Sequence, residues 1–259
     1  MTQKTIPWRT LLRLLALACC VLLQGHPAAA AATGFQGPRD MVWSASDGHN
    51  QRIYFSTFLN GSWSAPVRVT GDNGDHYLPC IDRAADGTRH LVWAGYDEYG
   101  QTIQHATLVN GKWSAAERLP ALPATSSAPF VTVDDRGRVF VVFIGNDGED
   151  DDIYWSRLEN GTWSESRRVH ADNDTPDINP YVEITDTNTV VVTWQGYRGD
   201  RYLTLQSVWG GDRWQPETVA DGADGQAEDE REARSETPAE SLPDFVTDKR
   251  QVFTRIHGQ

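Results

Sequence analysis

The stretch "LENGTWSESRRV" (Leu158–Val169) repeats a phrase that occurs twice before it in the chain. The earlier copies are "FLNGSWSAPVRV" (Phe58–Val69) and "LVNGKWSAAERL" (Leu108–Leu119), and a looser fourth copy, "VWGGDRWQPETV", ends at Val219. In the first three copies an Asn-Gly pair precedes a tryptophan. Asn-Gly favours a type I′ hairpin because both central residues of that turn need positive φ. The phrase therefore predicts a tight hairpin followed by an outer strand.

The tryptophans set the length of the repeat. They are spaced by 50, 50 and 51 residues: Trp63, Trp113, Trp163 and Trp214. Two further series keep these intervals, namely Trp43, Trp93, Phe143 and Trp194, and then Pro79, Pro129 and Pro180. Three sets of residues that recur at the same intervals indicate a structural repeat. A repeat length near fifty residues is typical of propellers and solenoids.

Each unit is predicted to contain four short strands. From Pro129, "PFVTV" and "RVFVVFI" flank the turn "DDRG", the run "IYWSRLE" alternates in polarity, and "TWSESRRV" follows the Asn-Gly pair. Four antiparallel strands per unit form a propeller blade. The sequence therefore predicts an all-β protein, a β-propeller of four to five blades of about 50 residues each. We expect each repeated tryptophan to cover the neighbouring blade.

The two ends of the predicted propeller look complementary. The stretch "RDMVWSASDG" resembles a second strand, whereas "LPDFVTDKRQVFTRIHG" (Leu242–Gly258) resembles a first and a second strand. We expect the C-terminal first strand to complete the N-terminal blade and close the ring, which removes open edges. This gives four blades, or five if both partial units stand alone. The alternative is a half-ring that pairs with another chain as a homo-oligomer. The acidic segment 221–241 is predicted to be a flexible insertion.

Residues 1–32 have the pattern of a secretory signal peptide. Lys4, Arg9 and Arg13 precede the apolar run Leu14–Leu23, and alanine-rich cleavage sites follow. We therefore expect a single domain over 33–259, exported from the cytoplasm and either secreted or periplasmic, with no membrane insertion after cleavage. An uncleaved anchor is the alternative. Only Cys80 lies outside the leader, which excludes an intrachain disulfide in the domain.

The charge of the chain is strongly acidic. The formal net charge is -13, and the leader carries three positive charges and no negative ones, so cleavage takes it to -16. Binding of nucleic acid or anionic lipid needs a basic face, which this composition does not offer. A neutral or cationic ligand, or a bound cation, suits the charge better.

The acidic residues gather in one class of predicted loop. In a propeller, the loops from second to third strands and from each blade to the next emerge on the same face, and here these loops are long and acidic. Oxygen-rich loops such as "GDNGD", "NDGEDDD" and "ADNDTPD" suit calcium, although none has EF-hand spacing and acidic loops without metal are the alternative. The candidate calcium ligands are Asp72, Asp75, Asp147, Asp150, Asp172, Asp174 and Asp177.

Aromatic and basic residues occupy the same predicted loops. Tyrosine rings stack on the apolar faces of sugars, and arginine donates hydrogen bonds to hydroxyl groups. A generic polar rim is the alternative. The candidate ligand-binding residues are Tyr96, Asp97, Tyr99, Tyr197, Arg198 and Arg201.

The repeat unit, of the form "P…D…G…hlvW…iyys…NG.Ws.p..v", resembles the sialidase-type (BNR-like) repeats of secreted bacterial propellers. Sialidases carry Asp-boxes, Ser-x-Asp-x-Gly-x-Thr-Trp. Here Ser56 and Ser156 stand at the box serine, but Phe58 and Leu158 replace its aspartate. The arginine triad of the family cannot be assigned either. The resemblance thus implies the fold and a carbohydrate context, with degenerate boxes.

Three functions follow from these patterns. The first is a non-catalytic propeller outside the cytoplasm that binds a glycan or a partner protein through its acidic, aromatic-bearing face. The second is a sialidase-like glycoside hydrolase that uses two carboxylates of that face. The third is an assembly module in which two chains complete one propeller.

Overall fold

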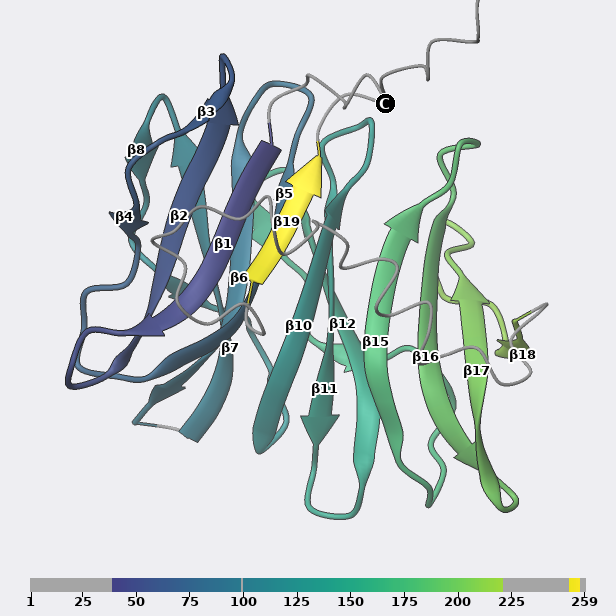
Figure 1. Cartoon of the computed structure of the whole chain (residues 1–259). Coiled ribbons are helices and arrows are strands. Elements are labelled where there is room, and N and C mark those ends of the chain that lie inside the picture. Colours follow the sequence, from purple (N-terminus) through teal and green to yellow (C-terminus); the bar gives the residue numbers. More distant parts are fainter. Residues whose placement is uncertain (1–38, 99, 221–251, 257–259) are drawn as a thin grey trace, which may run out of the picture. The chain divides into compact units, whose positions relative to one another are not determined.

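The computed structural model describes residues 39–98, 100–220 and, for the backbone alone, 252–256. The described residues form β-strands joined by turns and loops (Figure 1). They include no helix with the length and apolar character that a membrane crossing requires. The predicted signal peptide and the predicted insertion at 221–241 lie outside the described residues.

The strands form four antiparallel sheets. The first contains β1 (Arg39–Ser46), β2 (Gln51–Leu59), β3 (Ser62–Trp63), β4 (Val67–Arg68) and β19 (Val252–Ile256). The second contains β5 (His76–Arg83), β6 (Arg89–Asp97), β7 (Gly100–Val109), β8 (Lys112–Trp113) and β9 (Glu117–Arg118). The third contains β10 (Thr125–Val133), β11 (Val139–Asn146), β12 (Asp151–Glu159), β13 (Thr162–Trp163) and β14 (Arg167–Arg168). The fourth contains β15 (Asp177–Ile184), β16 (Val190–Arg198), β17 (Arg201–Val208) and β18 (Thr218–Val219).

The arrangement of the sheets is that of propeller blades. The first strands contact one another in succession, β5 against β10 and β10 against β15, and β1 lies against β5. Each blade then runs outward through its second and third strands to a fourth strand. In the first three blades this outer strand is split into two short pieces that both pair with the third strand. The predicted fold class, an all-β propeller with four-stranded antiparallel blades, is confirmed.

A C-terminal strand completes the N-terminal blade. β19 pairs antiparallel with β1, with Trp43 opposite Val252 and Arg39 opposite Ile256 (Figure 1). The pairing segment is Val252–Ile256, which we expected to be a second strand. The expected first strand, "LPDFV" at 242–246, lies outside the described residues. The described strands make up four blades, and closure of the ring remains a prediction.

The Asn-Gly pairs form the predicted hairpins. The φ angles of Asn60, Asn110 and Asn160 are 54°, 50° and 51°. The following glycines, Gly61, Gly111 and Gly161, have φ angles of 84°, 77° and 76°. Two successive positive φ angles define the type I′ turn, which matches the right-handed twist of the flanking strands.

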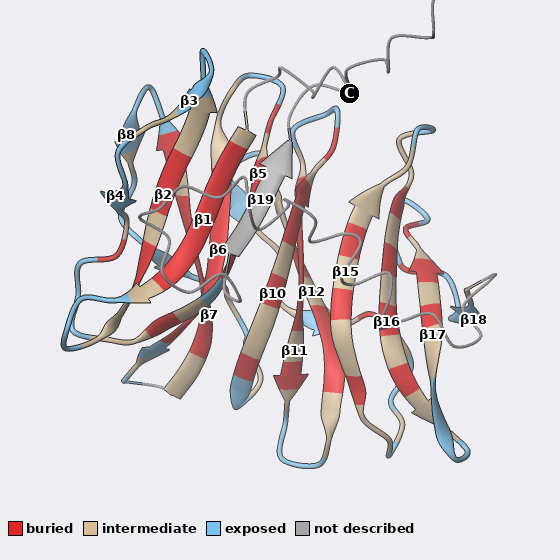
Figure 2. Cartoon of the chain, viewed as in Figure 1, coloured by how far each residue is buried: buried red, intermediate tan, exposed pale blue. Residues whose placement is uncertain are grey.

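The repeated tryptophans cover the preceding blade, as the repeat predicts. The ring centroids of Trp113 and Phe55 are 5.4 Å apart, those of Trp163 and His105 5.0 Å, and those of Trp214 and Trp155 5.7 Å. The covered residues lie on the third strands β2, β7 and β12, also fifty positions apart. The buried positions run along the strands and the exposed ones mark the turns (Figure 2).

The serines at the Asp-box position have a structural role. Ser56 and Ser156 are fully buried, and their Oγ atoms donate to the carbonyls of Ser64 and Ser164 at 2.8 Å and 2.7 Å. The acceptors lie at the break between the two pieces of the outer strand. Each serine therefore replaces a ladder hydrogen bond where the outer strand leaves the sheet.

Candidate functional site

The two acidic loop classes meet on one side of the blades. Arg52, which follows the loop between β1 and β2, donates to the carbonyl of Gly74 at 2.8 Å in the loop that enters the second blade. The backbone N–H of Gln51 donates to Asp75 Oδ1 at 2.7 Å. The same pairing of loops recurs between the third and fourth blades, through Arg168. These contacts agree with the predicted common face.

A first polar group joins the first and second blades. His76 Nε2 lies 2.7 Å from Asp72 Oδ1, and the indole of Trp93 donates to His76 Nδ1 at 2.9 Å. His76 is fully buried, so its ring is fixed from both sides. Burial works to raise the pKa of Asp72, but the hydrogen bonds from His76 and Gly74 together with the charge of Arg52 lower it.

A second polar group joins the third and fourth blades around Arg168. Its Nε donates to Asp152 Oδ2 at 2.6 Å, its NH1 lies 3.1 Å from Asp172 Oδ2, and its NH2 pairs with Asp147. Burial raises the pKa of Asp152 against the opposing effect of Arg168. Burial, followed by the charges of nearby carboxylates, also raises the pKa of Asp150.

Asp177 anchors the same group from the start of β15. Its Oδ1 accepts hydrogen bonds from the indole Nε1 of Trp194 at 2.8 Å and from Arg198 NH2 at 3.1 Å. Its Oδ2 accepts one from Asn173 Nδ2 at 3.0 Å. The ring of His170 stacks on Trp194, with centroids 5.4 Å apart. Trp194 therefore orients both Asp177 and His170.

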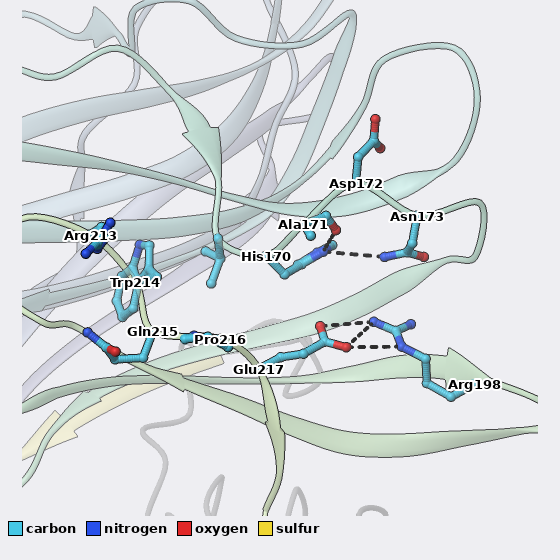
Figure 3. A pocket seen from close by; sticks show the side chains of 11 residues that line it. His170, Ala171, Asp172, Asn173, Arg198, Arg213, Trp214, Gln215, Pro216 and Glu217 are labelled. Carbon is cyan, nitrogen blue, oxygen red and sulfur yellow. Dashed lines mark hydrogen bonds and ion pairs between the residues drawn. The ribbon is translucent and has the colours of Figure 1, made fainter.

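A groove of about 630 Å³ lies beside this group (Figure 3). One wall is the segment 169–173 between β14 and β15, and the other is the segment 213–217 that leads into β18. Arg198 NH2 lies 3.1 Å from Glu217 Oε1, so this ion pair connects β16 to the second wall. Trp214, Gln215 and Asn173 add an indole and two amides to the lining.

The described candidate ligand-binding residues lie in the second and the fourth blades, with the third blade between them in the sequence. Tyr96 is half exposed at 49% and contacts Tyr77 edge to face, while Asp97 accepts a hydrogen bond from Thr102. In the fourth blade, Tyr197 contacts Tyr202, and Arg201 is exposed opposite Arg198 in the β16–β17 ladder. Of the six, Arg198 lines the groove. Tyr99 lies outside the described residues.

The candidate calcium ligands fall into two separate groups. Asp72 and Asp75 lie between the first and second blades. Asp147, Asp150, Asp172 and Asp177 lie around Arg168 between the third and fourth blades, and Asp174 is exposed. In the described part of the chain, one cluster of three side chains has ligand atoms close enough to share an ion: Asp152, His170 and Asp177. Asp177 is the member that the sequence pattern included.

Sequence patterns did not single out His170 or the groove residues Arg213, Gln215 and Glu217. A signal for both exists in the repeat itself. The fourth copy departs from the Asn-Gly phrase at "GGDRWQPE", which supplies Arg213, Gln215 and Glu217. His170 follows the third copy at a position held by Thr70 and Pro120 in the earlier copies. Departures from a structural repeat mark positions that packing alone does not require.

No protein-family model and no curated protein matches this sequence. Among solved structures, a protein of unknown function from Dyadobacter fermentans is 14% identical over 66% of this chain and 58% of its own, with a TM-score of 0.53. An α-L-arabinofuranosidase of Fusarium graminearum in complex with an iminosugar inhibitor is 12% identical over 67% of this chain and 59% of its own, with a TM-score of 0.52.

A second structure of a Fusarium graminearum α-L-arabinofuranosidase, with arabinobiose, is 12% identical over 70% of this chain and 63% of its own, with a TM-score of 0.50. This chain thus spans about three fifths of the length of the structures it matches. The fold defines the class of the protein: it is a β-propeller with four-stranded antiparallel blades. The resemblance to sialidase-type repeats is supported as far as this fold, and membership of that family is not confirmed.

Proposed function

We propose that this protein recognises a neutral oligosaccharide in the groove between the segments 169–173 and 213–217. The observation that carries the proposal is the lining of this groove. It combines the side-chain amides of Asn173 and Gln215 with the Arg198–Glu217 ion pair, beside the largely buried Trp214. Saccharides offer hydroxyl groups to planar donors and acceptors of this kind.

Charge favours a neutral ligand over an acidic one. The lining carries the side chains of Arg198 and Arg213 against those of Asp172 and Glu217, so its formal charges cancel. The chain as a whole carries a net charge of -13. An acidic sugar would approach against this field, and Arg198 is already paired with Glu217 and Asp177. A sialic acid or a sulfated uronate polymer is therefore a poorer ligand than a neutral pentose oligosaccharide.

The structural neighbours support the same class of ligand. One Fusarium graminearum arabinofuranosidase structure contains arabinobiose and the other an iminosugar inhibitor. We place this recognition outside the cytoplasm because of the signal-peptide pattern in residues 1–32.

Hydrolysis of the bound saccharide is the second candidate function, and the activity named for the neighbouring structures favours it. A glycoside hydrolase needs an acid and a second carboxylate on either side of the scissile bond. Asp172 and Glu217 are the carboxylates that line the groove, and each has an arginine partner. Binding without turnover would leave recognition as the function.

The test is calorimetric titration of arabinobiose and longer arabino-oligosaccharides into the protein, followed by an assay for released arabinose. We expect saturable binding that weakens at least about tenfold in the Arg213→Ala/Gln215→Ala variant, because both exposed side chains line the groove. Arg136→Ala is the matched control, since Arg136 is exposed in the β10–β11 turn. Release of arabinose that stops in Glu217→Gln would support hydrolysis. Equal binding by both variants, or no binding by the parent protein, would refute the proposal.

A further inference from the structure

Three buried side chains from two blades converge beneath the wall of the groove. Asp152 lies on β12, Asp177 begins β15, and His170 lies in the segment that connects these blades. The side chains of the two aspartates are fully buried and that of His170 is 1% exposed. His170 Nε2 lies 3.5 Å from Asp177 Oδ2 and 3.8 Å from Asp152 Oδ1. These three ligand atoms all lie within 4.8 Å of one another.

The hydrogen bonds of His170 assign its tautomer. Nδ1 lies 2.8 Å from the carbonyl oxygen of Ala171, which accepts only, so Nδ1 carries the proton. Nε2 is therefore the unprotonated nitrogen, and its lone pair accepts a long hydrogen bond of 3.3 Å from the backbone N–H of Ile153, which a metal ion would have to displace. Nε2 and the two carboxylate oxygens therefore lie close together. Three electron-rich atoms in a buried site repel each other unless a proton or a metal cation lies between them.

Asp152 provides the second, independent observation. Its Oδ1 is fully buried and has no hydrogen-bond partner, although Oδ2 is held by Arg168. A buried carboxylate oxygen without a donor is costly and rare in folded proteins. We propose that Asp152, His170 and Asp177 bind a divalent transition-metal ion, such as Zn²⁺, through Oδ1, Nε2 and Oδ2.

The spacing of the three atoms fits a shared ion better than direct hydrogen bonds. Zinc binds nitrogen and oxygen at about 2.0–2.2 Å, so two ligands of one ion lie roughly 3.3–3.6 Å apart. The observed 3.5 Å is within this range and 3.8 Å lies slightly above it. An imidazole ligand selects zinc or a neighbouring transition metal over calcium, which takes oxygen ligands. This proposal therefore differs in metal and in ligands from the calcium sites expected from the acidic loops.

The groups around the ligands have the positions that outer-shell partners of a metal site take. The Nδ1–H of His170 is bonded to a carbonyl, Asp152 is held by Arg168, and Asp177 by Trp194. Asn173 donates to the Oδ2 of Asp177 and leaves that oxygen a second lone pair. The surrounding carboxylates outnumber the guanidiniums of Arg168 and Arg198, so a divalent cation also reduces local repulsion.

A bound ion has two consequences in this position. It connects β12 of the third blade to β15 of the fourth and stabilises the folded state that presents its ligands. It also fixes His170, whose segment forms one wall of the groove (Figure 3). His170 is also among the residues that line the groove, although its side chain is 1% exposed.

The test uses the untagged protein after treatment with a chelator. We expect calorimetry to show one equivalent of Zn²⁺ bound with a dissociation constant on the order of micromolar or tighter. Saturation should raise the melting temperature by about 5 °C. Replacement by Co²⁺ should give visible absorption bands of nitrogen and oxygen coordination, a readout that needs no variant. The proposal would be overturned if calorimetry showed no zinc binding and cobalt gave no absorption bands. Binding of calcium alone would also overturn it.

Variants identify the site among the histidines of the chain. His170→Gln should remove the equivalent of zinc, and Asp152→Asn should weaken binding at least about tenfold. His76→Gln is the matched control because His76 is equally buried but is bonded to Asp72 and Trp93, outside the cluster. Loss of zinc in His76→Gln with retention in His170→Gln would contradict the assignment. If His170→Gln fails to fold, the wild-type cobalt spectrum and zinc stoichiometry decide the proposal.

Discussion

The indole Nε1 of Trp163 donates a hydrogen bond of 2.9 Å to the carboxylate of Glu117 in the preceding blade. The same carboxylate oxygen accepts a hydrogen bond of 2.9 Å from His105 Nδ1, and the ring of Trp163 packs against His105. The hydrogen bond from His105 is the main reason that the pKa of Glu117 is lowered. The repeated tryptophan thus joins adjacent blades by a polar contact as well as by ring packing.

Trp163→Phe should retain the ring packing and lose the hydrogen bond to Glu117. We expect a coupling free energy of about 0.5–1 kcal/mol between Trp163→Phe and Glu117→Ala in a double-mutant cycle. The measurement is urea unfolding of the two single variants and the double variant. Additive changes in the free energy of unfolding would show that the hydrogen bond contributes nothing across the interface.

Gly161→Ala should destabilise the third hairpin by about 1 kcal/mol, because alanine is strained at a φ of 76° although no atom lies within 4 Å of the added Cβ. Gly71→Ala is the matched control. Gly71 lies outside the left-handed region, and the nearest atom to its added Cβ is 4.0 Å away, so this variant should be neutral or slightly stabilised. Equal unfolding midpoints for the two variants would contradict the strain argument.

Stability should fall between pH 7 and pH 5 because of His90. Burial, followed by the charge of neighbouring His105, lowers the pKa of His90 from 6.5 to about 4, against the opposing effect of Asp86. The unfolded chain therefore binds the proton first as pH falls, and this favours unfolding until pH approaches 4. The loss is about 2 kcal/mol between pH 7 and pH 5.

The matched experiment is chemical unfolding of the parent protein and of His90→Gln at both pH values. The variant should lose less stability than the parent over this interval, by about 1 kcal/mol per pH unit. A parent and a variant with the same pH dependence would show that His90 is protonated equally in both states.

Arg168→Lys should destabilise the junction of the third and fourth blades by about 2 kcal/mol. The planar guanidinium of Arg168 pairs with Asp152, Asp172 and Asp147 at once, and the single ammonium group of lysine cannot replace all three contacts. Its neighbour Arg167 gives a matched control, since that side chain is 72% exposed and pairs at 3.6 Å with Glu165. Arg167→Lys should change stability by less than about 0.5 kcal/mol. Similar losses in both variants would contradict the bridging role of Arg168.

Much of the fold could be predicted from the sequence because the features that determine it are local and repeated. The Asn-Gly turns at Asn60, Asn110 and Asn160 and the intervals between tryptophans depend on short-range patterns. The sequence pattern favours "LPDFV" as the partner of β1, but "QVFTRI" has equal strand character and pairing depends on contacts distant in sequence. Val252–Ile256 makes that pairing.

The candidate site was predictable only in part. Loop composition placed the acidic residues on a common face, which brought Asp147, Asp150, Asp172 and Asp177 into one neighbourhood. The sequence could not show that Arg168 and Arg198 would pair with most of them, or that His170 would turn inward beside Asp152. These features depend on how the third blade packs against the fourth, and side-chain orientation at such a junction has no local sequence signal.

The most direct test of the central claim is a crystal structure of the protein grown with arabinobiose. We expect saccharide density in the groove between the segments 169–173 and 213–217, with hydroxyl groups within hydrogen-bond distance of Gln215 or Glu217. Saccharide bound elsewhere on the blades, or an empty groove at a concentration that saturates binding in solution, would contradict it.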